Sequence, residues 1–231
     1  MLLISSLLDN IILDIPITVI LLIWVIFVVY YIARWTYNFA IMHGRTPHSA
    51  TYFGRKVIHF LAGGLVAFLL PYFFKEPVLP LIMAIILSVG VYIPHKTGKL
   101  MYWFQDPENI YEVDFTIMWG IIVFFTWFID PTFWLGVVPL LIMAWGDGIT
   151  GIVRNFKYGR RVKGWEGSIA MLILSIIIGL KLGIAGITAA IIATLVERYE
   201  RIDDNITVPL TSLFILIVAY YFAPNLLIGL W

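Results

Sequence analysis

Residues 133–153 read FWLGVVPLLIMAWGDGITGIV, an apolar run with one charged side chain, Asp147. A helix of about 20 such residues crosses the hydrocarbon layer of a bilayer. Seven further apolar runs lie at residues 12–32, 57–74, 78–93, 115–129, 168–182, 183–196 and 208–222. They are continuous rather than alternating, which favours helices over a closed barrel. The sequence therefore predicts an all-α polytopic membrane protein with about eight transmembrane helices, seven and nine being the alternatives.

Composition supports this prediction and excludes other classes. Of the 231 residues, 61% are hydrophobic and 13% are charged, against about 25% charged in soluble proteins. A soluble globule of this size cannot bury so much apolar surface. The chain has no cysteine and a net charge of +1, which excludes thiolate metal sites and argues against a nucleic-acid partner. No repeat or linker interrupts residues 1–231, so we expect a single transmembrane catalytic domain.

The basic residues predict the orientation. Segments 34–56, 94–114, 154–167 and 197–207 would face one side, and they carry all Lys and Arg residues except Lys75 and Lys181. By the positive-inside rule these segments are cytoplasmic and both termini lie outside. The N-terminal stretch carries Asp9 and Asp14 rather than a basic region, which indicates a tail leading into a span and not a cleaved signal peptide. Polar residues gather on the cytoplasmic face, which disfavours a transport path through the bilayer.

Two groups at helix ends could carry chemistry. Arg55 and His59, in the stretch GRKVIH at 54–59, share one helix face. They indicate either anchoring at the membrane surface or a phosphate contact beside a polar residue of an active cleft. Asp147 lies seven residues before Arg154, about 10 Å along a helix. A carboxylate at that depth must be paired, protonated or bound to a cation.

Two loops add basic and acidic groups. The segment RNFKYGRRVKGWEGS, residues 154–168, is a glycine-rich basic loop before a helix, as in phosphate sites, although it also suits anionic lipid. Asp203, Asp204 and Asn205 offer the hard oxygen ligands that Mg²⁺ prefers. Their alternative role is to cap the last helix, which needs only one of them. A weaker acidic group is largely explained by a solvated loop, although its last two members directly precede a span: Asp106, Glu108, Glu112 and Asp114.

Three separated elements carry a family resemblance. They are Arg-Lys-x-x-His at 55–59, Gly-Asp at 146–147 with Lys-x-x-Glu-Gly-Ser at 163–168, and Glu197 followed by Asp-Asp-Asn-x-Thr-x-Pro at 203–209. In this order the sequence resembles the dolichol kinase/phytol kinase family of CTP-dependent polyprenol kinases. It departs from the family at 148–151, where Gly-Ile-Thr-Gly replaces small residues with an alanine. The resemblance implies a helical membrane fold, CTP as phosphoryl donor, Mg²⁺, and a membrane-embedded isoprenoid alcohol as acceptor.

The expected activity is phosphorylation of a polyprenol, dolichol, phytol or geranylgeraniol to its monophosphate at the cytoplasmic face. One alternative is a CTP-dependent cytidylyltransferase that makes a CDP-activated lipid, although its longer C-terminal signature is absent here. A second alternative is a non-enzymatic small transporter or lipid scaffold. Such a protein would bind no nucleotide and would tolerate the loss of Asp204.

The resemblance, together with the residue types, yields candidates for each role. Glu166 and His59 are alternatives for orienting or deprotonating the alcohol, and Asp147 completes the catalytic set. The candidates for the CTP phosphates are Arg55, Lys56, Arg160, Lys163, Gly167 and Ser168. The candidates for Mg²⁺ are Asp147, Asp203, Asp204 and Asn205.

Overall fold

The computed structural model describes residues 2–159, 162–199 and 202–229. Its α-helices are α1 (Leu2–Phe27), α2 (Ala33–Met42), α3 (Pro47–Ile58), α4 (Leu65–Phe73), α5 (Val78–Thr97), α6 (Tyr111–Trp127), α7 (Trp134–Leu141), α8 (Asp147–Tyr158), α9 (Trp165–Gly179), α10 (Gly183–Tyr199) and α11 (Asp204–Phe222). None of the residues so described forms a strand, so the predicted all-helical class is confirmed.

Three short π-helical segments join consecutive helices into longer ones. They are η1 (Val28–Ile32) between α1 and α2, η2 (His59–Gly64) between α3 and α4, and η3 (Ile142–Gly146) between α7 and α8. Single π turns inside α-helices often occur at functional sites. Here η2 begins at His59 and η3 ends one residue before Asp147, so both lie beside residues that the sequence singled out.

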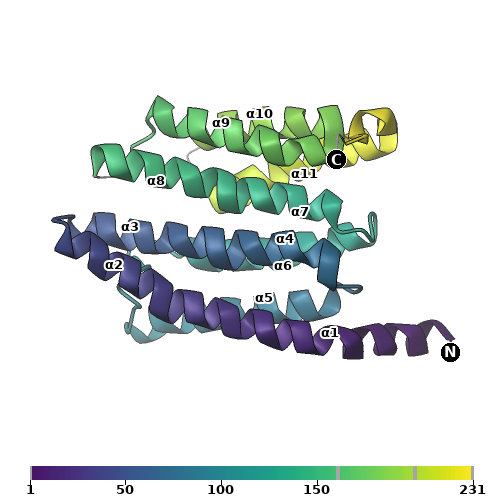
Figure 1. Ribbon diagram of the computed structural model, residues 1–231, viewed down its shortest axis with the longest axis horizontal. Coiled ribbons are helices and arrows are strands. Elements are labelled where there is room, and N and C mark those ends of the chain that lie inside the picture. The colour runs from purple at the N-terminus through teal and green to yellow at the C-terminus, as the bar shows by residue number, and fades with distance from the viewer. Residues whose placement is uncertain (1, 160–161, 200–201, 230–231) are drawn as a thin grey trace.

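The helices lie lengthwise and pack in layers (Figure 1). The continuous helix α7–η3–α8 lies in the middle, with α9, α10 and α11 on one side and α3, α4 and α6 on the other; α1, α2 and α5 form the outer layer beyond them. Most of this central helix is buried in the protein, whereas the other long apolar helices expose much of their surface. Asp147 therefore projects from the most enclosed helix of the molecule.

Six helical segments of the described chain are long and apolar enough to cross a membrane: Asp9–Met42, Pro47–Phe73, Val78–Thr97, Trp134–Tyr158, Trp165–Tyr199 and Asp204–Phe222. The protein is thus a helical membrane protein. Two features separate this number from the predicted eight. α6 has only 17 residues, and the Trp165–Tyr199 segment turns back on itself at Gly183, whose φ is 60°. α9 and α10 then pack against each other, and Gly183 is the boundary predicted between the runs 168–182 and 183–196.

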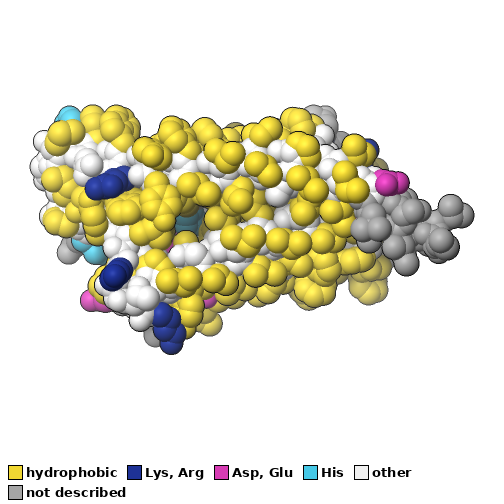
Figure 2. Space-filling view, turned by 90° about the horizontal axis from the view of Figure 1, so that it is seen from below, with side chains coloured by type: hydrophobic (Ala, Val, Ile, Leu, Met, Phe, Trp, Pro, Cys, Tyr) yellow, Lys and Arg dark blue, Asp and Glu magenta, His cyan; other side chains and the backbone are white. Residues whose placement is uncertain are grey.

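The four polar segments of the sequence meet at one end of the molecule, which we call the polar end. Hydrogen bonds link them in pairs: Arg45 to the Phe156 carbonyl (3.2 Å), Thr51 to the Tyr102 carbonyl (2.8 Å), and Asn205 to the Tyr111 carbonyl (3.1 Å). Lysine and arginine side chains cluster at this end of an otherwise apolar surface (Figure 2). At the other end, Asp14 accepts hydrogen bonds from the backbone N–H groups of Lys75 and Glu76.

The α9–α10 pair depends on two glycines. A Cβ placed on Gly186 would lie 2.0 Å from the carbonyl oxygen of Gly179, so any side chain there forces the helices apart. Forced overpacking typically costs about 1–3 kcal/mol. We therefore expect Gly186→Ala to lower the melting temperature of the purified protein in detergent.

Gly90→Ala is the matched control, because Gly90 is also helical but has no atom within 4 Å of its ideal Cβ position. Its melting temperature should stay the same or rise, since alanine favours a helix more than glycine does. Equal melting temperatures for the two variants would show that α9 and α10 do not pack this closely.

Candidate active site

At the polar end, Asp147 lies against two side chains from the α3–η2 helix. Lys56 donates a hydrogen bond to Oδ2 of Asp147 at 2.5 Å, and Nδ1 of His59 lies 3.7 Å from the same oxygen. All three side chains are buried. Gly151, one turn after Asp147, makes this approach possible, because a Cβ there would lie 2.2 Å from Cε of Lys56.

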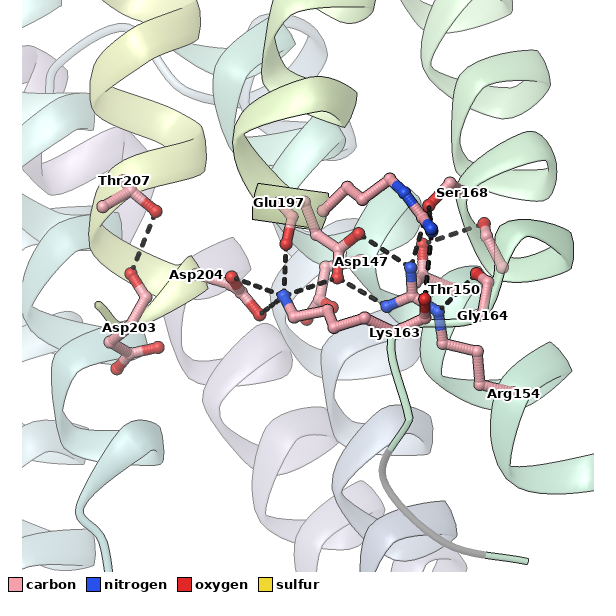
Figure 3. Close-up of polar contacts among 12 residues, drawn as sticks. Asp147, Thr150, Arg154, Lys163, Gly164, Ser168, Glu197, Asp203, Asp204 and Thr207 are labelled. Carbon is pink, nitrogen blue, oxygen red and sulfur yellow. Dashed lines mark hydrogen bonds and ion pairs between the residues drawn. The ribbon is translucent and has the colours of Figure 1, made fainter. Parts of the chain in front are cut away.

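A second group of charges surrounds Glu197 at the end of α10 (Figure 3). Arg154 holds both carboxylate oxygens of Glu197, at 2.6 and 3.1 Å. Lys163 donates to Glu197 Oε1 at 3.0 Å and to both oxygens of Asp204 at 3.3 Å. Arg154 also donates to the Gly164 carbonyl and to the Ser168 hydroxyl. This arginine therefore ties α8, α9 and α10 to one another.

The carboxylates of Asp147, Glu197 and Asp204 form one cluster, with ligand oxygens that all lie within 4.8 Å of one another. Each is less than a tenth exposed. Three oxygen-donor groups at this spacing suit a divalent cation shared with substrate phosphates. Lys56, Arg154 and Lys163 supply a matching number of positive charges, as buried carboxylates require. The donor set thus fits Mg²⁺, through Asp147 and Asp204 as predicted and through Glu197.

Asp203 and Asn205, the other predicted metal ligands, make local contacts at the start of α11. Asp203 caps the helix and accepts hydrogen bonds from the backbone N–H and side-chain amide of Asn205, both at 2.9 Å. Asn205 also donates to the Tyr111 carbonyl. Burial raises the pKa of Asp203 to about 7, and the neighbouring Asp114 carboxyl acts in the same direction. Asp203 thus caps α11, the alternative role that the sequence offered, and its neighbour Asp204 turns toward Lys163. Oδ2 of Asp203 and Oδ1 of Asn205 have no hydrogen-bond partner among the described residues, and the metal-binding role of both residues stays a prediction.

Two cavities meet at the α3–η2 helix. A polar cleft is lined by Tyr52, Arg55, Lys56, His59, Tyr111, Asp147, Asp203, Asp204 and Asn205. An apolar cavity, partly open to the outside, lies between α1, η2, α5 and α6. Arg55 and His59 line both. A molecule in the apolar cavity and one in the polar cleft would therefore meet at these two side chains.

The remaining predicted residues lie around this core. Ser168 contacts Arg154, and Gly167 faces the same arginine, because a Cβ on it would lie 2.5 Å from Nε of Arg154. Glu166 is exposed and binds Lys157 and the Tyr158 hydroxyl at the periphery. Arg160 lies outside the described residues. The roles of Glu166, Gly167, Ser168 and Arg160 stay predictions.

The sequence does not reveal the pair Arg154–Glu197. In the sequence Glu197 stands out only as part of a motif, and Arg154 only as a marker of the membrane surface and as a cation of the basic loop at 154–168. The available signal was the depth of Glu197, which follows an apolar run directly and so needs a buried partner. Nothing in the spacing of the two residues, 43 positions apart, indicates that they pair.

The Arg154–Glu197 pair should matter for stability. Glu197→Gln keeps the volume of the side chain but leaves Arg154 buried without its countercharge, which costs about 3–5 kcal/mol in buried pairs. We expect a clear loss of thermal stability in detergent. Lys157→Ala, which breaks an exposed pair with Glu166, should change stability little. Similar small effects of both substitutions would contradict the structural role of Glu197.

One of three comparisons with known proteins found a match, and it agrees with the motifs. No family model matches the chain, and no solved structure matches it. A curated relative, the probable phytol kinase, chloroplastic, of Zea mays, is 28% identical over 202 residues, covering 70% of this chain. The chain spans 64% of the length of that relative. This similarity to a probable phytol kinase agrees with the resemblance drawn from the three motifs.

Proposed function

We propose that this protein is a CTP-dependent kinase that phosphorylates a long-chain isoprenoid alcohol in the membrane. One observation carries the proposal: the polar cleft with its carboxylates adjoins an apolar cavity, and Arg55 and His59 line both. A kinase for a lipid alcohol needs this arrangement, because a charged donor must meet an apolar acceptor. The name of the maize relative supports the same chemistry.

The charged residues of the cleft suit a nucleotide triphosphate. Asp147, Glu197 and Asp204 would hold Mg²⁺, and the ion would neutralise charge on the phosphates. Lys163 and Lys56 already contact these carboxylates, so both lie where phosphate oxygens would gather. Arg55, at the junction of the two cavities, can contact the phosphate that is transferred. Arg160 and the amides of Gly167 and Ser168 are further phosphate candidates in this proposal.

In the transfer, the alcohol oxygen bonds to the γ-phosphorus of CTP, the bond to the β–γ bridging oxygen breaks, and CDP leaves. The hydroxyl proton needs an acceptor at the junction. Of the two predicted candidates, His59 lies there and Glu166 does not. Nδ1 of His59 has no hydrogen-bond partner among the described residues. Asp147, 3.7 Å away, would stabilise the imidazolium that forms when His59 takes the proton.

We also propose eight membrane crossings with the polar end in the cytoplasm. The six segments of sufficient length become eight when α9 and α10 are taken as separate crossings and α6 is added. The clustering of basic segments at one end supports this orientation by the positive-inside rule. In this orientation cytoplasmic CTP reaches the cleft directly.

The activity is tested with purified protein, Mg²⁺, geranylgeraniol, and CTP labelled at either the α- or the γ-phosphate. The proposal predicts γ-label in the lipid product and α-label in CDP. Transfer of α-label to the lipid with release of pyrophosphate would establish a cytidylyltransferase instead. No transfer from CTP to geranylgeraniol, phytol or longer polyprenols would refute the kinase.

Asp204→Asn tests the metal assignment. The substitution keeps the shape of the side chain but removes a negative charge. A metal acting as Lewis acid is worth several kcal/mol, so we expect turnover to fall at least about a hundredfold. Thermal stabilisation by Mg²⁺–CTP should also be lost. Asp106→Asn, in a loop away from the cleft, should keep wild-type turnover. Near-normal turnover of Asp204→Asn would remove Asp204 from the site.

Orientation can be tested with single cysteines, because the chain has none of its own. Lys157→Cys at the polar end and Lys75→Cys at the opposite end are both exposed positions. In intact cells that express the protein, a membrane-impermeant thiol reagent should label only Lys75→Cys, and lysis should expose Lys157→Cys. The reverse pattern would overturn the orientation and the access of CTP.

A further inference from the structure

The apolar cavity has mainly apolar walls and one polar end. Its walls come from α1 and η1 (Val25, Val29), η2 and α4 (Ala62, Val66), and α5 (Met83, Leu87). Seen from the side of α1 and α5, the apolar surface has a hollow toward the polar end (Figure 2). At that end the lining changes to Arg55, His59 and Glu112. The cavity thus combines the apolar walls of a lipid-chain site with a polar group at the head.

Glu112 is held in an unusual way for a buried carboxyl. Its Oε1 contacts Nε2 of His95 at 2.6 Å and Nε2 of Gln105 at 2.9 Å, while its Oε2 is buried without a hydrogen-bond partner in the described part of the chain. Gln105 is itself fixed, because it donates to the Val91 carbonyl and accepts from the backbone N–H of Met101. Glu112 is 7% exposed. A buried acceptor left without a donor is costly, and ligands commonly supply the missing partner.

Nδ1 of His59 is a second buried atom without a hydrogen-bond partner in the described part of the chain, and Phe115 connects His59 with Glu112. The Phe115 ring packs on the His59 ring, with centroids 4.3 Å apart. Phe115 follows Glu112 by three residues on α6, which is about 5 Å along the helix axis. Because Phe115 packs on His59, Glu112 lies about one helical turn of α6 away from the residue that contacts His59. Glu112 and His59, each with a buried atom that lacks a hydrogen-bond partner among the described residues, therefore line the same largely apolar cavity.

We propose that the cavity between α1, η2, α5 and α6 holds the chain of the isoprenoid alcohol and that Glu112 binds its hydroxyl group. The inference rests on the proposed kinase function. A hydroxyl has one hydrogen, so it donates to one acceptor at a time. Glu112 accepts that hydrogen when the alcohol binds, and rotation about the C–O bond brings it to His59 for the transfer. Glu112 thus sets affinity for an alcohol over a chain without a hydroxyl, and His59 sets turnover.

Glu112→Gln is the first test, made by binding tritiated geranylgeraniol and its methyl ether to the protein in nanodiscs without nucleotide. The substitution keeps one oxygen for His95 and Gln105 but replaces the free acceptor with an N–H donor. We expect the preference for the alcohol over the ether to fall at least about tenfold, as for loss of a hydrogen bond to a charged group. The KM for the alcohol should rise, while the KM for CTP and kcat stay within a few-fold of wild type. An unchanged preference would overturn the role of Glu112.

The second test fills the cavity. Leu87 lines it, whereas the adjacent Ile86 is exposed on the outer face of the same helix. Leu87→Trp should weaken geranylgeraniol binding at least about tenfold and keep thermal stabilisation by Mg²⁺–CTP, and Ile86→Trp should match wild type. Wild-type binding by Leu87→Trp, or equal competition by dioleoylphosphatidylcholine, would overturn the cavity assignment. A wild-type protein that binds geranylgeraniol but transfers no phosphate would instead refute the kinase and leave the cavity inference standing.

Discussion

Buried charges control the architecture of the polar end. Asp147, Glu197 and Asp204 lie in a protein whose interior and surroundings are largely apolar, and an unpaired charge there costs several kcal/mol. Lys56, Arg154 and Lys163 balance them through contacts of 2.5 to 3.3 Å. These six residues come from distant parts of the sequence, so their pairing brings α3, α8, α10 and α11 to one point. The helix ends cannot separate without exposing charges to lipid or leaving them alone in the core.

The pairing of carboxylates with cationic side chains also explains how one site could accept a charged donor next to an apolar acceptor. A Mg²⁺–triphosphate brings both signs of charge, so cation and phosphates can replace lysine–carboxylate contacts without leaving a charge unpaired. The continuous helix α3–η2–α4 separates the two environments: Lys56 lines the polar cleft, Ala62 and Val66 line the apolar cavity, and His59 lines both. In the proposed reaction, this helix, which changes from basic to apolar within two turns, would determine where the two substrates meet.

The sequence predicts the helices well but identifies only some of the residues in the candidate site. Apolar runs predict the helices, and the glycine turn at Gly183 falls between two predicted runs. Both can be predicted because a helix or a turn depends mainly on residues that are close in the sequence. Asp147 and Asp204 could be identified as candidates, because a carboxylate within or beside a membrane-spanning run is costly and is usually paired or functional. The partner of Glu197 could not, because its pairing with Arg154 depends on how α8 and α10 pack. The exposed position of Glu166 likewise depends on tertiary contacts, as does Oε2 of Glu112, which has no hydrogen-bond partner among the described residues. The capping by Asp203 is a local contact, and the sequence offered it as an alternative.

The central claim is that the three buried carboxylates hold a divalent cation against the phosphates of the nucleotide. The most direct test replaces Mg²⁺ with Mn²⁺ and uses electron–nuclear double resonance on the protein, in excess over Mn²⁺, with a non-hydrolysable CTP analogue. The account predicts protein-bound Mn²⁺ with phosphorus couplings in the wild type, and free or more weakly held Mn²⁺ in Asp204→Asn. Mn²⁺ bound equally by both proteins, or by neither, would contradict it.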